Sequence, residues 1–156
     1  MSDDLAQTKI AALAAIGDLI VYSLSNEYDK TEILRAIEDV KVRFAWQPDD
    51  DCLVYSRSTR KWCDGQIVHI AVDDTTKKEW LTVKYQKQKK QIQRFSSGLM
   101  PIGMDKEYRC NQVIIQRILN EMGISIQNDI YRDQLPISWV TYHFRRNSFI
   151  QNLNSY

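Results

Sequence analysis

The hydrophobic positions at the start of the chain recur every three or four residues, which is the period of an amphipathic helix. The first such run predicts a helix over residues 2–24, with Ser2 or Asp3 as its cap. The second predicts a helix over residues 29–44, whose "DKTE" start has capping-box character. Two consecutive helices favour a hairpin, and the first is so rich in alanine and isoleucine that we expect it to be buried nearly all round.

From residue 52 the period changes to two, which is typical of half-buried strands. Four or five short strands are expected, and four of them are placed at residues 52–56, 62–71, 79–85 and 91–95, with the polar turn "QKQKK" before the last of these. Alternation along the second strand assigns to one side Cys63, Gly65, Ile67 and His69. Gly65 is the expected site of a bend or of a close backbone approach. Short strands at this spacing indicate a small, strongly bent antiparallel barrel over residues 50–102.

The helical period returns after the barrel. Asp105 is expected to cap a helix over residues 106–123, and Gly123 is expected to end it. In the tail, Pro136 favours a helix over residues 137–151, although "WVTYHF" is β-prone. The pattern therefore predicts an α+β protein in three parts, namely an N-terminal helical hairpin (1–47), a barrel (50–102) and a C-terminal helical extension (104–156).

Charge is segregated along the chain, although the formal net charge is only +1. Residues 1–50 carry ten acidic and five basic residues, whereas residues 51–102 carry ten basic and five acidic residues. With 156 residues, of which 44% are hydrophobic and 26% charged, the chain has the composition of a folded domain or of two small units. The basic middle segment is therefore electrostatically distinct from an acidic front.

The cysteines and the apolar runs bear on location. Three scattered cysteines are too few for a disulfide framework, which favours a reducing compartment, the cytoplasm or the nucleus, with an organelle left open. The start "MSDDL" is acidic where a secretory signal would be basic. The most apolar run, residues 10–24, is interrupted by Gly17 and Asp18 and is shorter than the ~20 residues of a membrane helix. We therefore expect an intracellular protein with no membrane span.

Four motifs follow one another through the middle segment, namely "VYS", "KWCDGQI", "LTVKY" and "IQRFSSGLMPI". In this order and spacing, residues 52–102 resemble a Tudor domain, and the helical flanks lie outside the resemblance. The resemblance implies an SH3-like barrel. It also implies binding of methylated arginine or lysine in an aromatic cage, where a cation lies over several ring faces.

The cage carries over to this chain only in part. Tyr55 ends the first strand and Tyr85 ends the third, where the family places cage aromatics. Cys63 follows Trp62 where the family commonly has tyrosine, and the turn after Tyr85 holds no aromatic residue. The candidate ligand-binding residues at the barrel end are thus Tyr55, Trp62, Cys63 and Tyr85. The two tyrosines equally suit a role in the barrel core.

The run "KYQKQKKQIQR" is a second candidate site, because small barrels hold single-stranded nucleic acid with basic side chains and aromatic rings. The same pattern suits a solvated turn or a lysine-guarded sheet edge. The candidate nucleic-acid contacts are Lys84, Lys87, Lys89, Lys90 and Arg94.

Catalytic and metal-binding patterns are missing from the sequence. The soft metal ligands show no C-x-x-C spacing, and Cys63 and His69 would lie about 20 Å apart along an extended strand. The sequence has no nucleophile elbow and no glycine-rich phosphate loop. We therefore expect no enzymatic activity, no metal and no cofactor.

Large aromatic residues near the ends favour interfaces, and they include Trp46, Trp139, Tyr142, Phe144, Phe149 and Tyr156. The sequence thus predicts an adaptor or assembly subunit that binds another protein through the barrel end or the flanking helices. Two alternatives stay open. One is nucleic-acid or ribonucleoprotein binding through residues 84–94, and the other is recognition of methylated residues by an incomplete cage.

Overall fold

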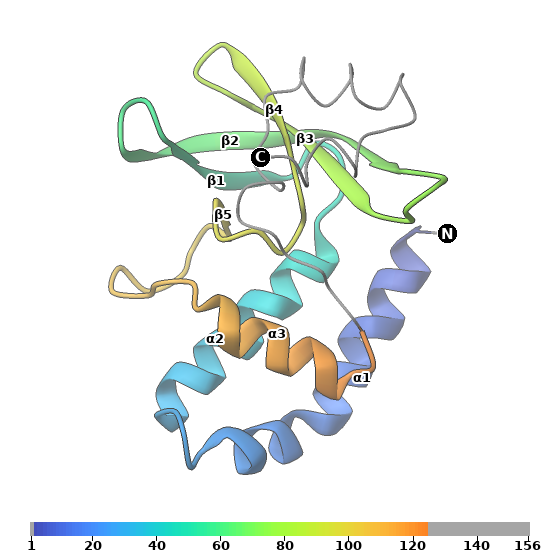
Figure 1. Cartoon of the computed structure of the whole chain (residues 1–156), viewed down its shortest axis with the longest axis vertical. Helices are drawn as coiled ribbons and strands as arrows, with labels where there is room; N and C mark the ends of the chain where they lie inside the picture. The colour runs from blue at the N-terminus through green and yellow to red at the C-terminus, as the bar shows by residue number, and fades with distance from the viewer. Residues whose placement is uncertain (1, 125–156) are drawn as a thin grey trace. The chain divides into compact units, whose positions relative to one another are not determined.

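The computed structural model describes residues 2–124, and over this part of the chain the protein belongs to the α+β class (Figure 1). Within the described range, three helices accompany a five-stranded antiparallel sheet of order β4-β3-β2-β1-β5. These residues divide into a helical unit, residues 2–46 and 100–124, and a sheet unit, residues 47–99. The predicted fold class is confirmed at this level. The predicted helix at residues 137–151 and the aromatic residues of the tail lie outside the described residues.

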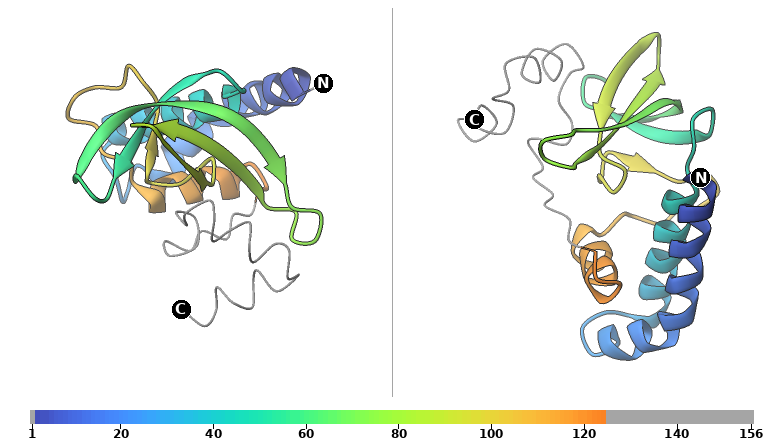
Figure 2. Two further views of the ribbon diagram at one scale, coloured as in Figure 1. Left: turned by 90° about the horizontal axis from the view of Figure 1, so that it is seen from above. Right: turned by 90° about the vertical axis from the view of Figure 1, so that its right-hand side faces the viewer.

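The helical unit is built on a hairpin of α1 (Ser2–Leu24) and α2 (Lys30–Ala45), which lie side by side in Figure 2. α3 (Gln112–Glu121) packs against α2. The predicted hairpin is confirmed, and α1 covers the predicted residues. Buried apolar side chains of its core include Leu13, Ile20, Leu24, Ile33, Val40, Phe44, Trp46, Ile114, Ile115, Ile118 and Leu119. Full burial of one such side chain contributes about 1.5–3 kcal/mol to the free energy of unfolding.

Two helix starts differ from the prediction. Asp29 is the N-cap of α2, but its side chain makes no capping hydrogen bond, so the expected capping box does not form. α3 begins at Gln112 instead of residue 106, because Asn111 caps it: its side-chain oxygen accepts hydrogen bonds from the backbone N–H groups of Val113 and Ile114.

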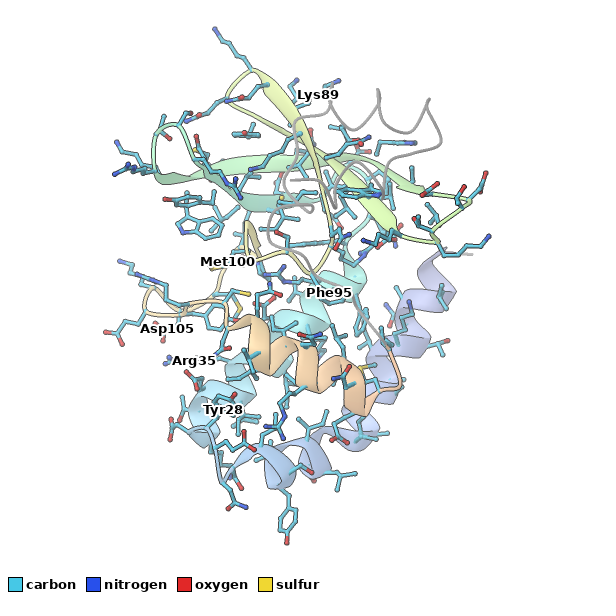
Figure 3. The ribbon with its side chains drawn as sticks, viewed as in Figure 1. Tyr28, Arg35, Lys89, Phe95, Met100 and Asp105 are labelled. Atoms are coloured by element: carbon cyan, nitrogen blue, oxygen red, sulfur yellow. The ribbon has the colours of Figure 1, made fainter. Side chains whose placement is uncertain are left out.

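Asp105, the predicted cap, instead closes a local turn. Its Oδ1 accepts a hydrogen bond from the backbone N–H of Glu107 at 2.9 Å, and its Oδ2 pairs with Arg35 at 2.9 Å (Figure 3). Such local bonds compete with helix formation. The predicted end of α3 is confirmed. Gly123 takes a φ of +77°, and the backbone N–H of Ile124 donates to the carbonyl of Leu119.

The five strands are β1 (Asp51–Ser56), β2 (Lys61–Val72), β3 (Glu79–Tyr85), β4 (Gln88–Ile92) and β5 (Leu99–Met100). The predicted polar turn is shorter than expected, because Gln86 and Lys87 alone reverse the chain with φ of 48° and 62°. Two consecutive positive φ angles are the signature of a type I′ hairpin turn. β4 therefore starts three residues earlier than predicted, and Arg94 and Phe95 lie beyond it.

β2 is long, curved and irregular (Figure 2). A Cβ atom on Gly65 would lie 2.5 Å from Val54 Cγ2 and 3.3 Å from Val83 Cγ1, which confirms the predicted close approach. The register with β3 shifts between Ile67 and His69. Because this bulge reverses the alternation, His69 is exposed while Ile67 is buried, so their predicted placement on one side is wrong.

α1 is far more exposed than predicted. Its fully buried side chains form one narrow stripe, whereas Leu5, Leu19 and Tyr22 are 58%, 56% and 79% exposed. The expectation of burial nearly all round is wrong because α1 packs mainly on α2, which covers only one side of it. Residues Leu5–Leu24 are also long and apolar enough to cross a membrane by length and composition alone, although the predicted apolar run was shorter.

Candidate functional site

Tyr55 and Trp62 form a partly exposed aromatic pair. They lie directly opposite each other in β1 and β2, and their ring centroids are 5.4 Å apart with an interplanar angle of 66°. This edge-to-face arrangement is a favourable geometry for aromatic rings. Trp62 is 38% exposed and Tyr55 is half-buried, so the pair presents a ring surface to solvent.

Cys63 and Tyr85, the other two predicted barrel-end residues, are buried. Cys63 follows Trp62 in β2, and successive side chains of a strand point to opposite faces of the sheet. Burial raises the pKa of the Tyr85 phenol, and the neighbouring Cys63 thiol adds to this shift. The structure thus separates the four residues into an outer pair, Tyr55 and Trp62, and an inner pair, Cys63 and Tyr85.

Lys90 lies on the same inner side of the sheet as Cys63 and Tyr85. It lies in β4 opposite Val83 and is only 7% exposed. Its Nζ donates a hydrogen bond to the backbone carbonyl of Tyr55 at 3.0 Å and lies 5.3 Å from the centroid of the Tyr85 ring. The chain's own ammonium group therefore occupies one ring face of the predicted cage. The two-residue turn brings Lys90 inward, because it sets the register of β4 on β3.

The remaining candidate nucleic-acid contacts divide in the same way. Lys84 and Lys89 are exposed cross-strand partners in β3 and β4, and Lys87 is exposed in the turn between them. Arg94 makes a bidentate ion pair with Glu79, with N–O distances of 2.7 and 3.1 Å, and this pair offsets its charge. Three of the five predicted basic side chains thus face solvent.

Three further basic residues lie at the same end of the sheet. Arg57, Arg60 and Lys61 are exposed in the β1–β2 hairpin. Because the strands are antiparallel, the β1–β2 and β3–β4 turns share one end of the sheet, opposite the β2–β3 turn (Figure 1). We call this set the basic end: Arg57, Arg60, Lys61, Lys84, Lys87 and Lys89. Arg57, Arg60 and Lys61 were not among the predicted contacts, although the segment "YSRSTRKW" shows these three basic residues close together.

The helical unit holds a buried polar network that the sequence reading did not identify. Arg43 and Asp39 are fully buried ion-pair partners on one face of α2, and the Tyr108 hydroxyl donates a hydrogen bond to the Asp39 carboxylate. The Arg43 guanidinium also lies 3.6 Å from the Cys110 sulfur and 5.5 Å from the centroid of the Trp46 ring. The i, i+4 spacing of Asp39 and Arg43 is the available sequence signal.

Burial and neighbouring charges shift the pKa values of Arg43, Tyr108 and Cys110 in this network. Burial is the largest effect on Arg43 and favours its neutral form, but Asp39, Cys110 and Tyr108 together outweigh it, so the pKa of the guanidinium is raised. Burial first, and then Asp39, raise the pKa of the Tyr108 phenol. Burial likewise raises the pKa of the Cys110 thiol, which makes it a poor nucleophile. The network therefore links α2 to residues 108–110 and stabilises the helical unit.

Between residues 2 and 124, no group of three histidine, cysteine or acidic side chains gathers in a way that would hold a metal ion. No protein-family model matches the chain, and neither a curated protein nor a solved structure matches it. Three exposed surfaces are present among the described residues: an apolar face of α1, the aromatic pair and the basic end.

Proposed function

We propose that this protein is a non-catalytic subunit that packs against a helix of a partner protein through the exposed face of α1. The observation that carries this proposal is a row of exposed positions with alternating three- and four-residue spacing. We call this row the α1 seam, and it consists of Leu5, Thr8, Ala12, Ala15, Leu19 and Tyr22. A 3-4 spacing of mostly apolar residues is the pattern with which one helix packs along another.

The composition of the α1 seam suits a helix as its partner. Alanines at its centre permit close approach of a second backbone, and large side chains at both ends supply apolar area to bury. Contiguous exposed apolar patches commonly mark protein–protein interaction sites.

A membrane fits α1 less well than a protein does. A helix that crosses a membrane alone exposes all its sides to lipid, but Leu13, Ile20 and Leu24 are buried in the core of the helical unit. Insertion would remove these side chains from the core. α1 also carries Asp18 near its middle and a single basic residue, Lys9, whereas helices that bind anionic membrane surfaces are rich in basic residues.

For the sheet unit, we propose an SH3-like barrel of the Tudor type. Its consecutive antiparallel strands, the bulge in β2 and the close packing at Gly65 support this proposal. The position of Lys90 weighs against a methyl-mark reader, since a cationic guest at the Tyr85 ring would meet a like charge. The proposed interaction therefore rests on α1 and not on the barrel end.

A photo-crosslinking amino acid placed at Ala12 or Ala15 in the full chain tests the proposal in cells. We expect protein adducts whose cross-linked peptide comes from an amphipathic helix, and we expect Leu5→Glu with Leu19→Glu to abolish them. The same amino acid at Ala14, which is exposed but off the α1 seam, should give no such adduct.

The matched control is Gln7→Glu with Ala14→Glu, which adds the same charge to α1 at exposed positions away from the α1 seam. It should leave the adducts unchanged. Adducts that survive the Leu5 and Leu19 substitutions, or that form only with lipid, would refute the proposal. Adducts between two copies of this chain would identify the partner as the protein itself.

A further inference from the structure

Lys84 and Lys89 of the basic end share one face of the sheet with the aromatic pair, and Arg57 and Arg60 lie in the turn beside that pair. Tyr55 and Trp62 are opposite each other on the outer face of β1 and β2. Gln66, four residues after Trp62, lies on the same face and is opposite Lys84, which in turn is opposite Lys89. The outer face of the sheet therefore runs from an exposed ring pair to an exposed lysine pair (Figure 3 labels Lys89).

The dimensions of this surface suit a chain and not a single small anion. Trp62 and Gln66 are four residues apart on the outer face of β2, which corresponds to about 13 Å along an extended strand. Lys84 and Lys89 lie one and two strands further across, at about 4.8 Å per strand. The basic groups of the two hairpins thus flank a track long enough for several successive phosphates.

Four residues of the basic end occupy positions that are unfavourable in the unbound sheet. Lys87 and Arg60 have φ of 62° and 57°, in the left-handed region where glycine or asparagine is preferred. Lys84 and Lys89 face each other directly, and like charges in that relation destabilise a sheet. An anionic ligand would relieve the repulsion that the unbound sheet carries.

Protection of a sheet edge explains only half of this charge. Lys87 and Lys89 belong to the β3–β4 hairpin, and β4 is an edge strand, where lysines discourage aggregation. Arg57, Arg60 and Lys61 lie in the hairpin between β1 and β2, which both have neighbours on each side. Edge protection therefore does not account for this second group.

We propose that the outer face of the sheet at the basic end binds single-stranded nucleic acid. The basic end neutralises the phosphates, and a base stacks on the exposed ring of Trp62, which Tyr55 holds edge-on. Duplex is disfavoured because its bases are already stacked and give Trp62 no ring to contact. Asp51 and Asp64 lie on the same face and reduce affinity for phosphate.

Fluorescence anisotropy with labelled 15-residue oligouridylate and oligothymidylate, on the full chain at 50–300 mM salt, tests this site. The logarithm of the binding constant should fall linearly with the logarithm of salt concentration, by about 0.7 per contacted phosphate. Arg57→Ala with Arg60→Ala and Lys61→Ala, and separately Lys84→Ala with Lys87→Ala and Lys89→Ala, should each reduce the slope by up to about 2.

Trp62 distinguishes stacking from charge. Trp62→Ala should weaken binding by about 5- to 100-fold at unchanged salt slope, and Trp62→Phe should restore most of it. Asp64→Asn should strengthen binding severalfold. Lys77→Ala with Lys78→Ala, in the β2–β3 turn at the opposite end of the sheet, removes two charges outside the proposed surface and should leave affinity unchanged.

Three results would overturn the proposal. The first is that the wild-type chain, with a native circular dichroism spectrum, does not bind at 50 mM salt. The second is that the Lys77 and Lys78 control loses as much affinity as the site variants. The third is that duplex binds as tightly as single strands. A polyglutamate peptide that binds as tightly and is indifferent to Trp62→Ala would instead assign the basic end to acidic protein segments.

Discussion

Gly65 lies where β1, β2 and β3 approach one another closely. Even the single methyl group of an alanine at this position would collide with its neighbours. An added Cβ would lie 2.5 Å from Val54 Cγ2, closer than two such carbon atoms can remain. We predict that Gly65→Ala lowers the free energy of unfolding by about 1–3 kcal/mol, in the range of overpacked cores. Urea unfolding monitored by circular dichroism measures this loss.

Val54→Ala removes the atom that an alanine at position 65 would meet. The double variant should therefore be less destabilised than the sum of the two single variants, with a coupling of at least about 0.5 kcal/mol. Strict additivity would show that the close contact does not limit this position.

Tyr108 gives the helical unit a predictable response to alkaline pH. Its folded-state pKa is raised, by burial first and then by the Asp39 carboxylate, whereas the unfolded chain releases the phenol proton near pH 10. The unfolded state thus binds fewer protons above about pH 10, and the free energy of unfolding falls there by up to ~1.4 kcal/mol per pH unit from this group.

Tyr108→Phe removes both the hydrogen bond to Asp39 and this titration. At pH 8 the variant should be less stable than the parent by about 1–3 kcal/mol, because a buried carboxylate oxygen loses a donor. The difference between the two proteins should shrink between pH 10 and 11. A constant difference in urea unfolding across this range would contradict the prediction.

At the scale of elements, the β3–β4 turn has a sequence poorly suited to its backbone. Gln86 and Lys87 both adopt positive φ, where asparagine and glycine are favoured. Gln86→Asn with Lys87→Gly should therefore raise the free energy of unfolding by about 1 kcal/mol. Lys87→Ala, which removes the charge but retains a Cβ, should give no such gain. A thermal unfolding series that ranks the two variants in the opposite order would show that the turn is not strained.

These elements also show where the sequence sufficed. Periodicity located α1, α2 and β3 because hydrophobic spacing directly reports helix and strand. It did not locate the start of β4, since "QKQKK" lacks the Asn-Gly signal of a two-residue turn and reads as uniformly polar. It also misjudged the exposure of α1, because burial depends on what packs there, and α2 covers a single stripe.

In the candidate sites too, local sequence patterns predict some features, whereas others depend on contacts between distant segments. Alternation is enough to separate Trp62 from Cys63, but the inward position of Lys90 depends on the register that the short turn sets. The basic end joins two hairpins that are far apart in sequence, so a search for one charged run finds only half of it. Pairing of Asp39 with Tyr108 spans 69 residues and leaves no local pattern.

At the scale of the whole molecule, the helical unit is discontinuous in sequence, because its residues 2–46 and 100–124 flank the sheet unit. α2 buries Ile33, Val40 and Phe44 in a core to which α3 contributes Ile114, Ile118 and Leu119. The Asp39 carboxylate likewise depends on the later segment for the Tyr108 hydroxyl. Stability of the N-terminal hairpin is therefore predicted to require chain that follows the sheet.

A fragment of residues 1–99 retains α1, α2 and β1–β4 but lacks α3 and Tyr108. Compared with residues 1–124, it exposes the apolar side of α2 and leaves the buried Asp39–Arg43 pair without one of its hydrogen-bond partners, which costs several kcal/mol in all. We predict a lower helical circular dichroism signal and a lower melting temperature for the shorter fragment. Equal melting of the two fragments would show that the hairpin is stable without α3, and that the division of the chain into these two units has no thermodynamic counterpart.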